Sequence, residues 1–90
     1  MNQIPIVVYT ASYCPYCTRA KALLTAQGLS YHEIDVTHDE KGRAELVEKA
    51  EGRRTVPQIF IYGKPIGGCD DLFEKVRTGE LDKLLKQGEA

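Results

Sequence analysis

The alternation of hydrophobic and polar residues divides the chain into short strands and amphipathic helices. Residues 4–10 are a nearly continuous apolar, largely β-branched run, which is typical of a central strand covered on both faces. In residues 15–27 the apolar positions instead recur at helical spacing, at Tyr16, Ala20, Leu23 and Leu24. The complete pattern predicts strands at 4–10, 31–36, 56–62 and 65–67, helices at 15–27, 37–51 and 70–79, and a last helical stretch at 81–85.

Particular residues indicate where these helices begin and end. Pro15 suits the first helical position, where no intrahelical N–H is needed, and Gly28 can adopt the left-handed conformation that ends a helix. Thr37 and Glu40 have the spacing of a capping box, and Gly52 is expected to end the helix that they begin.

The order β-α-β-α-β-β-α predicts an α/β fold. Its first half is a βαβ unit, whose two strands should be parallel and whose crossover should be right-handed. Its second half is a hairpin followed by a helix. We therefore expect a single domain over residues 1–90, built on a four-stranded mixed sheet with helices on both faces.

Composition and charge narrow the classes of function. The 90 residues are 42% hydrophobic and 28% charged, which is typical of a soluble, globular protein. A net charge of −1 indicates no surface for nucleic acid or membranes. The chain has no apolar run of about 18 residues, and its N-terminus lacks the features of a signal peptide. We therefore expect a cytoplasmic protein.

The stretch SYCPYC, residues 12–17, places Cys14 and Cys17 at the predicted junction of the first strand and first helix. Two such thiols can form a redox pair, bind a metal or be packed residues. A closed zinc site needs four ligands, and the remaining candidates, Cys69, His32 and His38, have no paired spacing. Because a CxxC motif within a βαβ pattern is typical of redox proteins, the redox interpretation is favoured.

The two cysteines should differ in their surroundings. Cys14 falls at the helix N-terminus, where free backbone N–H groups and the helix dipole favour an anion. We therefore expect it to be an exposed, readily ionised thiolate, and Cys17, one turn further along, to be a buried resolving thiol. Arg19, Arg53 and Arg54 are candidate cations near Cys14.

Two other stretches add to this motif. RRTVPQ, residues 53–58, places a proline at the second position of a strand, and GGCDD, residues 67–71, places two glycines and free N–H groups at a helix start. In this order and on these elements, CPYC, TVPQ and GGCDD closely resemble the glutaredoxins, in particular the short bacterial dithiol class. The resemblance covers residues 4–85. It implies a thioredoxin fold, a cis bond before Pro57 and glutathione as the ligand.

The resemblance also implies a role for each site residue. Cys14 would be the nucleophile and Cys17 the resolving cysteine. Family members often carry a lysine at the position of Ala11, so one cation is missing here, and Arg53 and Arg54 are candidates to replace it. The residues that would bind glutathione are Cys14, Tyr16, Arg53, Arg54, Thr55, Val56, Pro57, Gly68, Cys69 and Asp70.

By this resemblance the protein reduces glutathione mixed disulfides and protein disulfides. Glutathione would be a cosubstrate, restored by an NADPH-dependent reductase, with no tightly bound cofactor and no metal. The expected state is a monomer. Two alternatives stay open: a thioredoxin-like protein of the same fold that thioredoxin reductase reduces, and a dimeric iron–sulfur carrier held by Cys14 and two glutathiones. Cys69 is expected to be packed at a helix start, with regulatory oxidation as the alternative.

Overall fold

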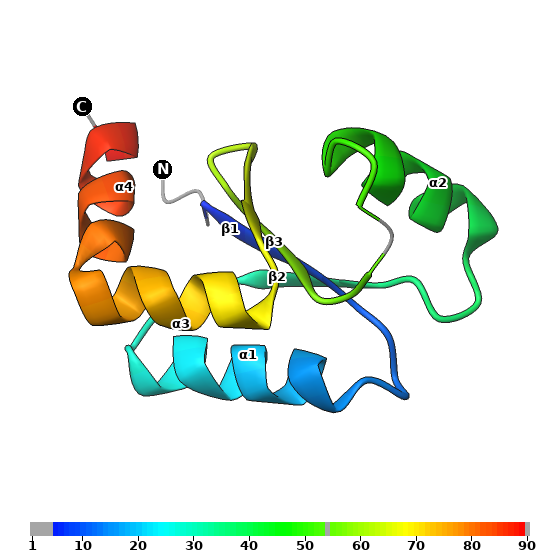
Figure 1. Ribbon diagram of the computed structural model, residues 1–90, viewed down its shortest axis with the longest axis horizontal. Helices are drawn as coiled ribbons and strands as arrows, with labels where there is room; N and C mark the ends of the chain where they lie inside the picture. Colours follow the sequence, from blue (N-terminus) through cyan, green and yellow to red (C-terminus); the bar gives the residue numbers. More distant parts are fainter. Residues whose placement is uncertain (1–4, 54, 90) are drawn as a thin grey trace.

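Four strands and four helices follow one another in the computed structural model, which describes residues 5–53 and 55–89 (Figure 1). The predicted order is confirmed, and the last helical stretch forms a separate fourth helix. The elements are β1 (Ile6–Thr10), α1 (Pro15–Ala26), β2 (His32–Asp35), α2 (Glu40–Lys49), β3 (Gln58–Ile61), β4 (Lys64–Gly67), α3 (Cys69–Thr78) and α4 (Glu80–Glu89).

The strands form the mixed sheet that the sequence predicts, in the order β2-β1-β3-β4. β1 and β2 are parallel and flank the crossover helix α1, whereas β3 is antiparallel to both β1 and β4. A two-residue turn, Tyr62 and Gly63, joins β3 to β4. Both residues have positive φ (51° and 79°), as the tight hairpin turns of the primed type require.

The two central strands, β1 and β3, are covered on both faces of the sheet, and successive residues of each strand point to opposite sides. On one face, Ile6 and Val8 pack beneath α1 and α3, and Leu81 brings α4 against the same core. On the other face, Tyr9 packs edge-on against Phe60, with ring centroids 5.5 Å apart, beneath α2. This double burial explains why β1 reads as a continuous apolar run rather than an alternating one.

The predicted capping box of α2 is wrong. The N-cap is Asp39, whose carboxylate accepts a hydrogen bond from the N–H of Gly42 at 2.9 Å. The Thr37 hydroxyl is engaged elsewhere, because it contacts Asp35 and accepts a hydrogen bond from the N–H of Ser12 at 2.8 Å. Asp39 is the nearer cap to the helix, and Thr37 instead ties the loop before Cys14 to the end of β2.

Several other expectations also differ from the structure: β1 begins at Ile6, β2 covers only His32–Asp35, and α3 begins one residue early, at Cys69. α2 ends at Lys49 rather than near residue 51, although Gly52 has the left-handed φ expected after a helix (96°). β3 begins at Gln58, because pairing with β1 starts there, opposite Tyr9. Tyr16 lies outside the core and is half exposed. Within the described residues, no helix is long and apolar enough to span a membrane.

Candidate functional site

Cys14 occupies the N-cap of α1, as predicted, with extended backbone angles before the first helical residue Pro15. Its N–H donates to the carbonyl of Ala11 at 3.1 Å, which closes the turn between β1 and α1. Its thiol is partly exposed and donates to the carbonyl of Val56 at 3.3 Å. The nucleophile candidate is therefore held against the segment that leads into β3.

Cys17 lies one turn further along α1 and is only 2% exposed. Cys14, Cys17 and Cys69 are all free cysteines in this structure. Burial raises the pKa of Cys17 from 9.0 to about 12, and the nearby Cys14 sulfur adds to this increase. The predicted difference between an accessible Cys14 and a buried Cys17 is confirmed by their positions.

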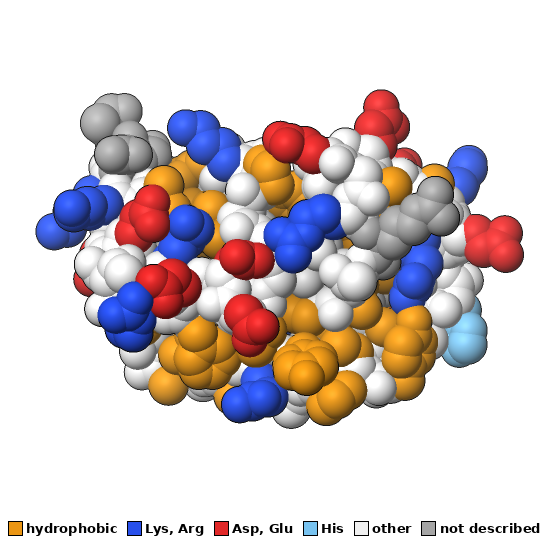
Figure 2. Space-filling model, in the orientation of Figure 1, with side chains coloured by type: hydrophobic (Ala, Val, Ile, Leu, Met, Phe, Trp, Pro, Cys, Tyr) orange, Lys and Arg blue, Asp and Glu red, His pale blue; other side chains and the backbone are white. Residues whose placement is uncertain are grey.

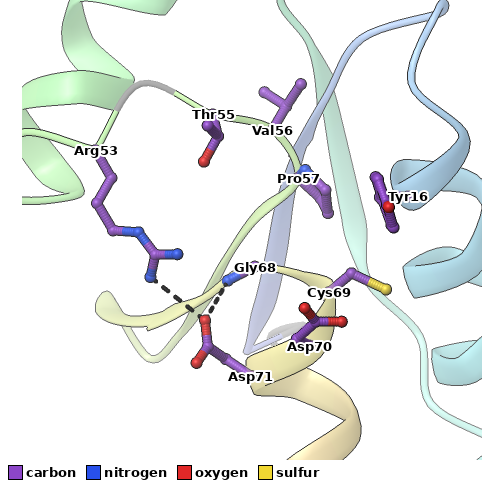
Figure 3. A pocket seen from close by; sticks show the side chains of 9 residues that line it. All are labelled: Tyr16, Arg53, Thr55, Val56, Pro57, Gly68, Cys69, Asp70 and Asp71. Atoms are coloured by element: carbon purple, nitrogen blue, oxygen red, sulfur yellow. Dashed lines mark hydrogen bonds and ion pairs between the residues drawn. The ribbon is translucent and has the colours of Figure 1, made fainter.

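A cleft of about 280 Å³ lies beside Cys14, between the start of α1, the segment before β3 and the start of α3 (Figure 3). Its volume is at the lower end for small-molecule sites, so it would enclose part of a flexible ligand rather than all of it. The bond between Val56 and Pro57 in its wall is cis, as the resemblance implied. The lining residues are Tyr16, Arg53, Thr55, Val56, Pro57, Gly68, Cys69, Asp70 and Asp71.

Asp71 organises the wall of this cleft, although sequence reasoning gave it no place in the site. Its carboxylate accepts a hydrogen bond from the N–H of Gly68 at 2.9 Å and pairs with the guanidinium of Arg53 at 3.4 Å (Figure 3). The repeated acid in GGCDD is the signal that could have suggested this role, because an acid three residues after an N-cap can reach back to its N–H. Asp71 thus links α3 to the segment before β3.

Most of the predicted glutathione-binding residues come together in this cleft. Cys14 borders it through Val56, and Arg54 lies outside the described residues. The charge of Arg19 opposes the rise in the pKa of Cys69 that burial causes. Ala11 is buried, and its position offers no cation.

Three exposed aromatic side chains belong to the residues that line the cleft or are near them along the chain. Tyr13 is 65% exposed, Tyr16 is 52% exposed and Phe73 is 42% exposed. Figure 2 shows hydrophobic side chains along the edge of the molecule where α1 and the loop before it lie. Arg43 of α2 donates a hydrogen bond to the Tyr13 hydroxyl, which tethers this loop.

The described residues contain no group of three or more His, Cys, Asp or Glu side chains that could hold a metal ion. His32 is exposed on β2, and His38 is exposed in the loop before α2. Neither side chain lines the cleft.

Comparison with known proteins identifies the family, because the sequence model of the Glutaredoxin family matches residues 6–66. This chain belongs to the glutaredoxin family. Curated relatives agree: Glutaredoxin 3 of Escherichia coli is 48% identical over 81 residues, which cover 90% of this chain and 96% of the relative. A glutaredoxin of Pseudomonas aeruginosa is 51% identical over 81 residues, covering 90% and 95%.

Solved structures confirm the thioredoxin-like glutaredoxin fold. The solution structure of glutaredoxin from Brucella melitensis matches with a TM-score of 0.81 and 48% identity, over 94% of this chain and 91% of that chain. The crystal structure of a buckwheat glutaredoxin–glutathione complex matches with a TM-score of 0.82 and 42% identity, over 92% and 77%. The predicted family and fold are therefore both confirmed.

Proposed function

We propose that this member of the glutaredoxin family is a glutathione-dependent thiol–disulfide oxidoreductase. Its substrates would be glutathione mixed disulfides and disulfide-bonded proteins. The observation that carries the proposal is the contact between the Cys14 thiol and the Val56 carbonyl, 3.3 Å apart, at the border of the cleft. The related buckwheat glutaredoxin forms a complex with glutathione, which supports the choice of ligand.

The Val56 carbonyl would accept a hydrogen bond both in the free protein and in the mixed disulfide with glutathione. In the free protein it accepts the hydrogen bond from the Cys14 thiol. When Cys14 is bonded to glutathione it has no proton to donate, so the carbonyl becomes free to accept from the cysteinyl N–H of the tripeptide. Backbone pairing of this kind would align glutathione along the segment before β3, as an added strand does.

The two ends of glutathione would then meet opposite sides of the cleft. The first turn of α3 has backbone N–H groups without intrahelical partners, at Cys69 and Asp70, and these suit the γ-glutamyl carboxylate. The Arg53 side chain is 52% exposed, and its guanidinium lies 3.4 Å from the Asp71 carboxylate, so it can turn toward the glycyl carboxylate.

The reduction would proceed by two thiol–disulfide exchanges at Cys14. The Cys14 thiolate attacks the glutathione sulfur of a mixed disulfide, the old sulfur–sulfur bond breaks, and the substrate thiolate leaves and takes up a proton. A second glutathione thiolate then attacks the glutathione sulfur bonded to Cys14. This step releases glutathione disulfide and regenerates Cys14.

Disulfide-bonded proteins would be reduced by a second route that uses both cysteines. Cys14 attacks the substrate disulfide and forms a mixed disulfide with the protein. Cys17 then attacks Cys14, the bond to the substrate breaks, and the enzyme is left with a Cys14–Cys17 disulfide. Two glutathione molecules then reduce this disulfide in successive exchanges, which restores the dithiol and releases glutathione disulfide.

A coupled assay with glutathione, glutathione reductase, NADPH and a small mixed disulfide tests the proposal. NADPH consumption should require Cys14 and should be retained in Cys17→Ser, which should lose only the reduction of protein disulfides. Loss of both activities in Cys17→Ser would contradict the assigned roles. Turnover with thioredoxin reductase in place of glutathione and its reductase would favour the thioredoxin-like alternative instead.

A further inference from the structure

A second polar cluster lies between α1 and the sheet, away from the glutathione cleft. The hydroxyl of Thr10, which is 1% exposed, donates to Oε2 of Glu33 at 2.7 Å. The ammonium of Lys21 pairs with the same oxygen at 3.0 Å. Strand register explains the meeting, because Glu33 pairs with Val8 and therefore points to the α1 side of the sheet, as Thr10 does two residues later.

This arrangement holds Lys21 close to the resolving cysteine. Lys21 follows Cys17 by four residues on α1, so the two side chains are neighbours on one face of the helix. The lysine side chain is 29% exposed, which leaves it partly shielded from solvent. The hydrogen bond from Thr10, followed by Lys21, lowers the pKa of Glu33, so the carboxylate that anchors the lysine is ionised at neutral pH.

The groups around Cys17 act on its ionisation in opposite directions. The Cys14 sulfur disfavours the Cys17 thiolate, whereas the backbone of Ala11 and, to a lesser degree, the Lys21 ammonium favour it. Pairing with Glu33 raises the pKa of Lys21, which keeps the ammonium charged throughout the physiological range. The other titratable groups of this neighbourhood are Arg19, Tyr31, Glu33, Asp35, Cys69 and Asp70.

We infer that Lys21, anchored by Glu33 and Thr10, is a positioning residue that stabilises the Cys17 thiolate while Cys17 attacks the Cys14 mixed disulfide. The inference rests on the dithiol route of the proposed function and adds a residue to it. A buried thiol needs such help, because only the thiolate is a nucleophile and burial without a cation disfavours it.

The step balances without an external oxidant. The Cys17 thiol gives its proton to solvent, and its sulfur forms a bond with the sulfur of Cys14. The bond between Cys14 and glutathione breaks, and the departing glutathione thiolate takes up a proton. The ammonium of Lys21 stays protonated and supplies its charge.

The test is a single-turnover measurement on full-length protein that has been glutathionylated at Cys14. Release of glutathione is followed against pH, without added thiols, in the original protein and in Lys21→Met, Lys21→Arg and Lys64→Met. Lys21→Met should release glutathione about tenfold more slowly at each pH near neutrality, so that its pH profile runs parallel to that of the original protein and is displaced to higher pH. Lys21→Arg should restore most of the rate.

The controls separate this inference from the proposed function. Lys64 is an exposed lysine on β4, so Lys64→Met removes the same charge and should leave the release rate and its pH profile unchanged. The dithiol route itself is refuted if the original protein releases no glutathione, or if Cys17→Ser releases it at the same rate as the original protein. If the original protein releases it and Lys21→Met has the same rate and pH profile, the role of Lys21 is refuted.

Discussion

Replacing Asp71 by Ala tests how the wall of the cleft is built. The carboxylate makes two contacts, with the Gly68 N–H at 2.9 Å and with the Arg53 guanidinium at 3.4 Å. The contact with Gly68 gives a hydrogen-bond acceptor to the N–H group that precedes α3. The contact with Arg53 joins α3 to the segment before β3. Alanine removes both contacts and leaves the Gly68 N–H without this acceptor.

The two contacts should contribute unequally to the free energy of unfolding. Loss of a side chain that caps a helix N-terminus costs about 1 kcal/mol in free energy of unfolding. The ion pair contributes less, about 0.5 kcal/mol at most, because its two side chains are 52% and 47% exposed and water screens their charges. The expected loss of about 1.5 kcal/mol lowers Tm by about 6–12 °C in a domain of this size.

The assay is thermal and denaturant unfolding of Asp71→Ala beside Asp71→Asn. The amide of asparagine keeps an oxygen that can accept the Gly68 N–H but lacks the charge that attracts Arg53. Asp71→Asn should therefore lose only about a third of what Asp71→Ala loses. The reasoning is refuted if Asp71→Ala unfolds at the same denaturant concentration as the original protein, or if the two variants are equally destabilised.

Two further predictions concern Cys17 and the turn before α3. Iodoacetamide should modify Cys14 but not Cys17 between pH 6 and 9, because a thiol with a pKa of about 12 is almost entirely protonated there; peptide mapping by mass spectrometry that finds both cysteines equally labelled would overturn this. Gly67→Ala should lower the free energy of unfolding by about 2 kcal/mol, because φ is +119° and a Cβ would lie 2.6 Å from Cγ of Asp71. It should also raise the Michaelis constant for glutathione, and an unchanged stability would show that the turn adapts.

The fold could be predicted because its signals are local. The apolar run of β1 reports burial on both faces, and Pro15 and Gly28 mark the two ends of α1. The cap of α2 could not be predicted in this way. Thr37 and Asp39 are both good N-cap residues, and the choice between them depends on the contact that Ser12, from a distant loop, makes with Thr37.

The same distinction between local and long-range signals applies to the candidate site. The residues of the cleft lie in three short motifs, so a sequence pattern is enough to gather them. Tyr16 shows the limit of the pattern, because its helical spacing with Ala20 suggested a core position, whereas its side chain lines the cleft and is half exposed. Lys21 and Glu33 lie outside any motif and meet only because β1 and β2 pair in a particular register.

The two sides of α1 therefore serve different steps of the proposed reaction. Tyr16 at its first turn lines the cleft, where glutathione would bind, whereas Cys17 is buried, and Lys21, one turn after it, pairs with Glu33 of β2. Arg53 and Asp71 form an ion pair in the cleft wall, and Lys21 pairs with Glu33 on the sheet side, so the two clusters share no partner. Changes at sites without shared partners usually have additive effects. Affinity for glutathione and the rate of disulfide closure should consequently respond independently, the first to the cleft and the second to Lys21.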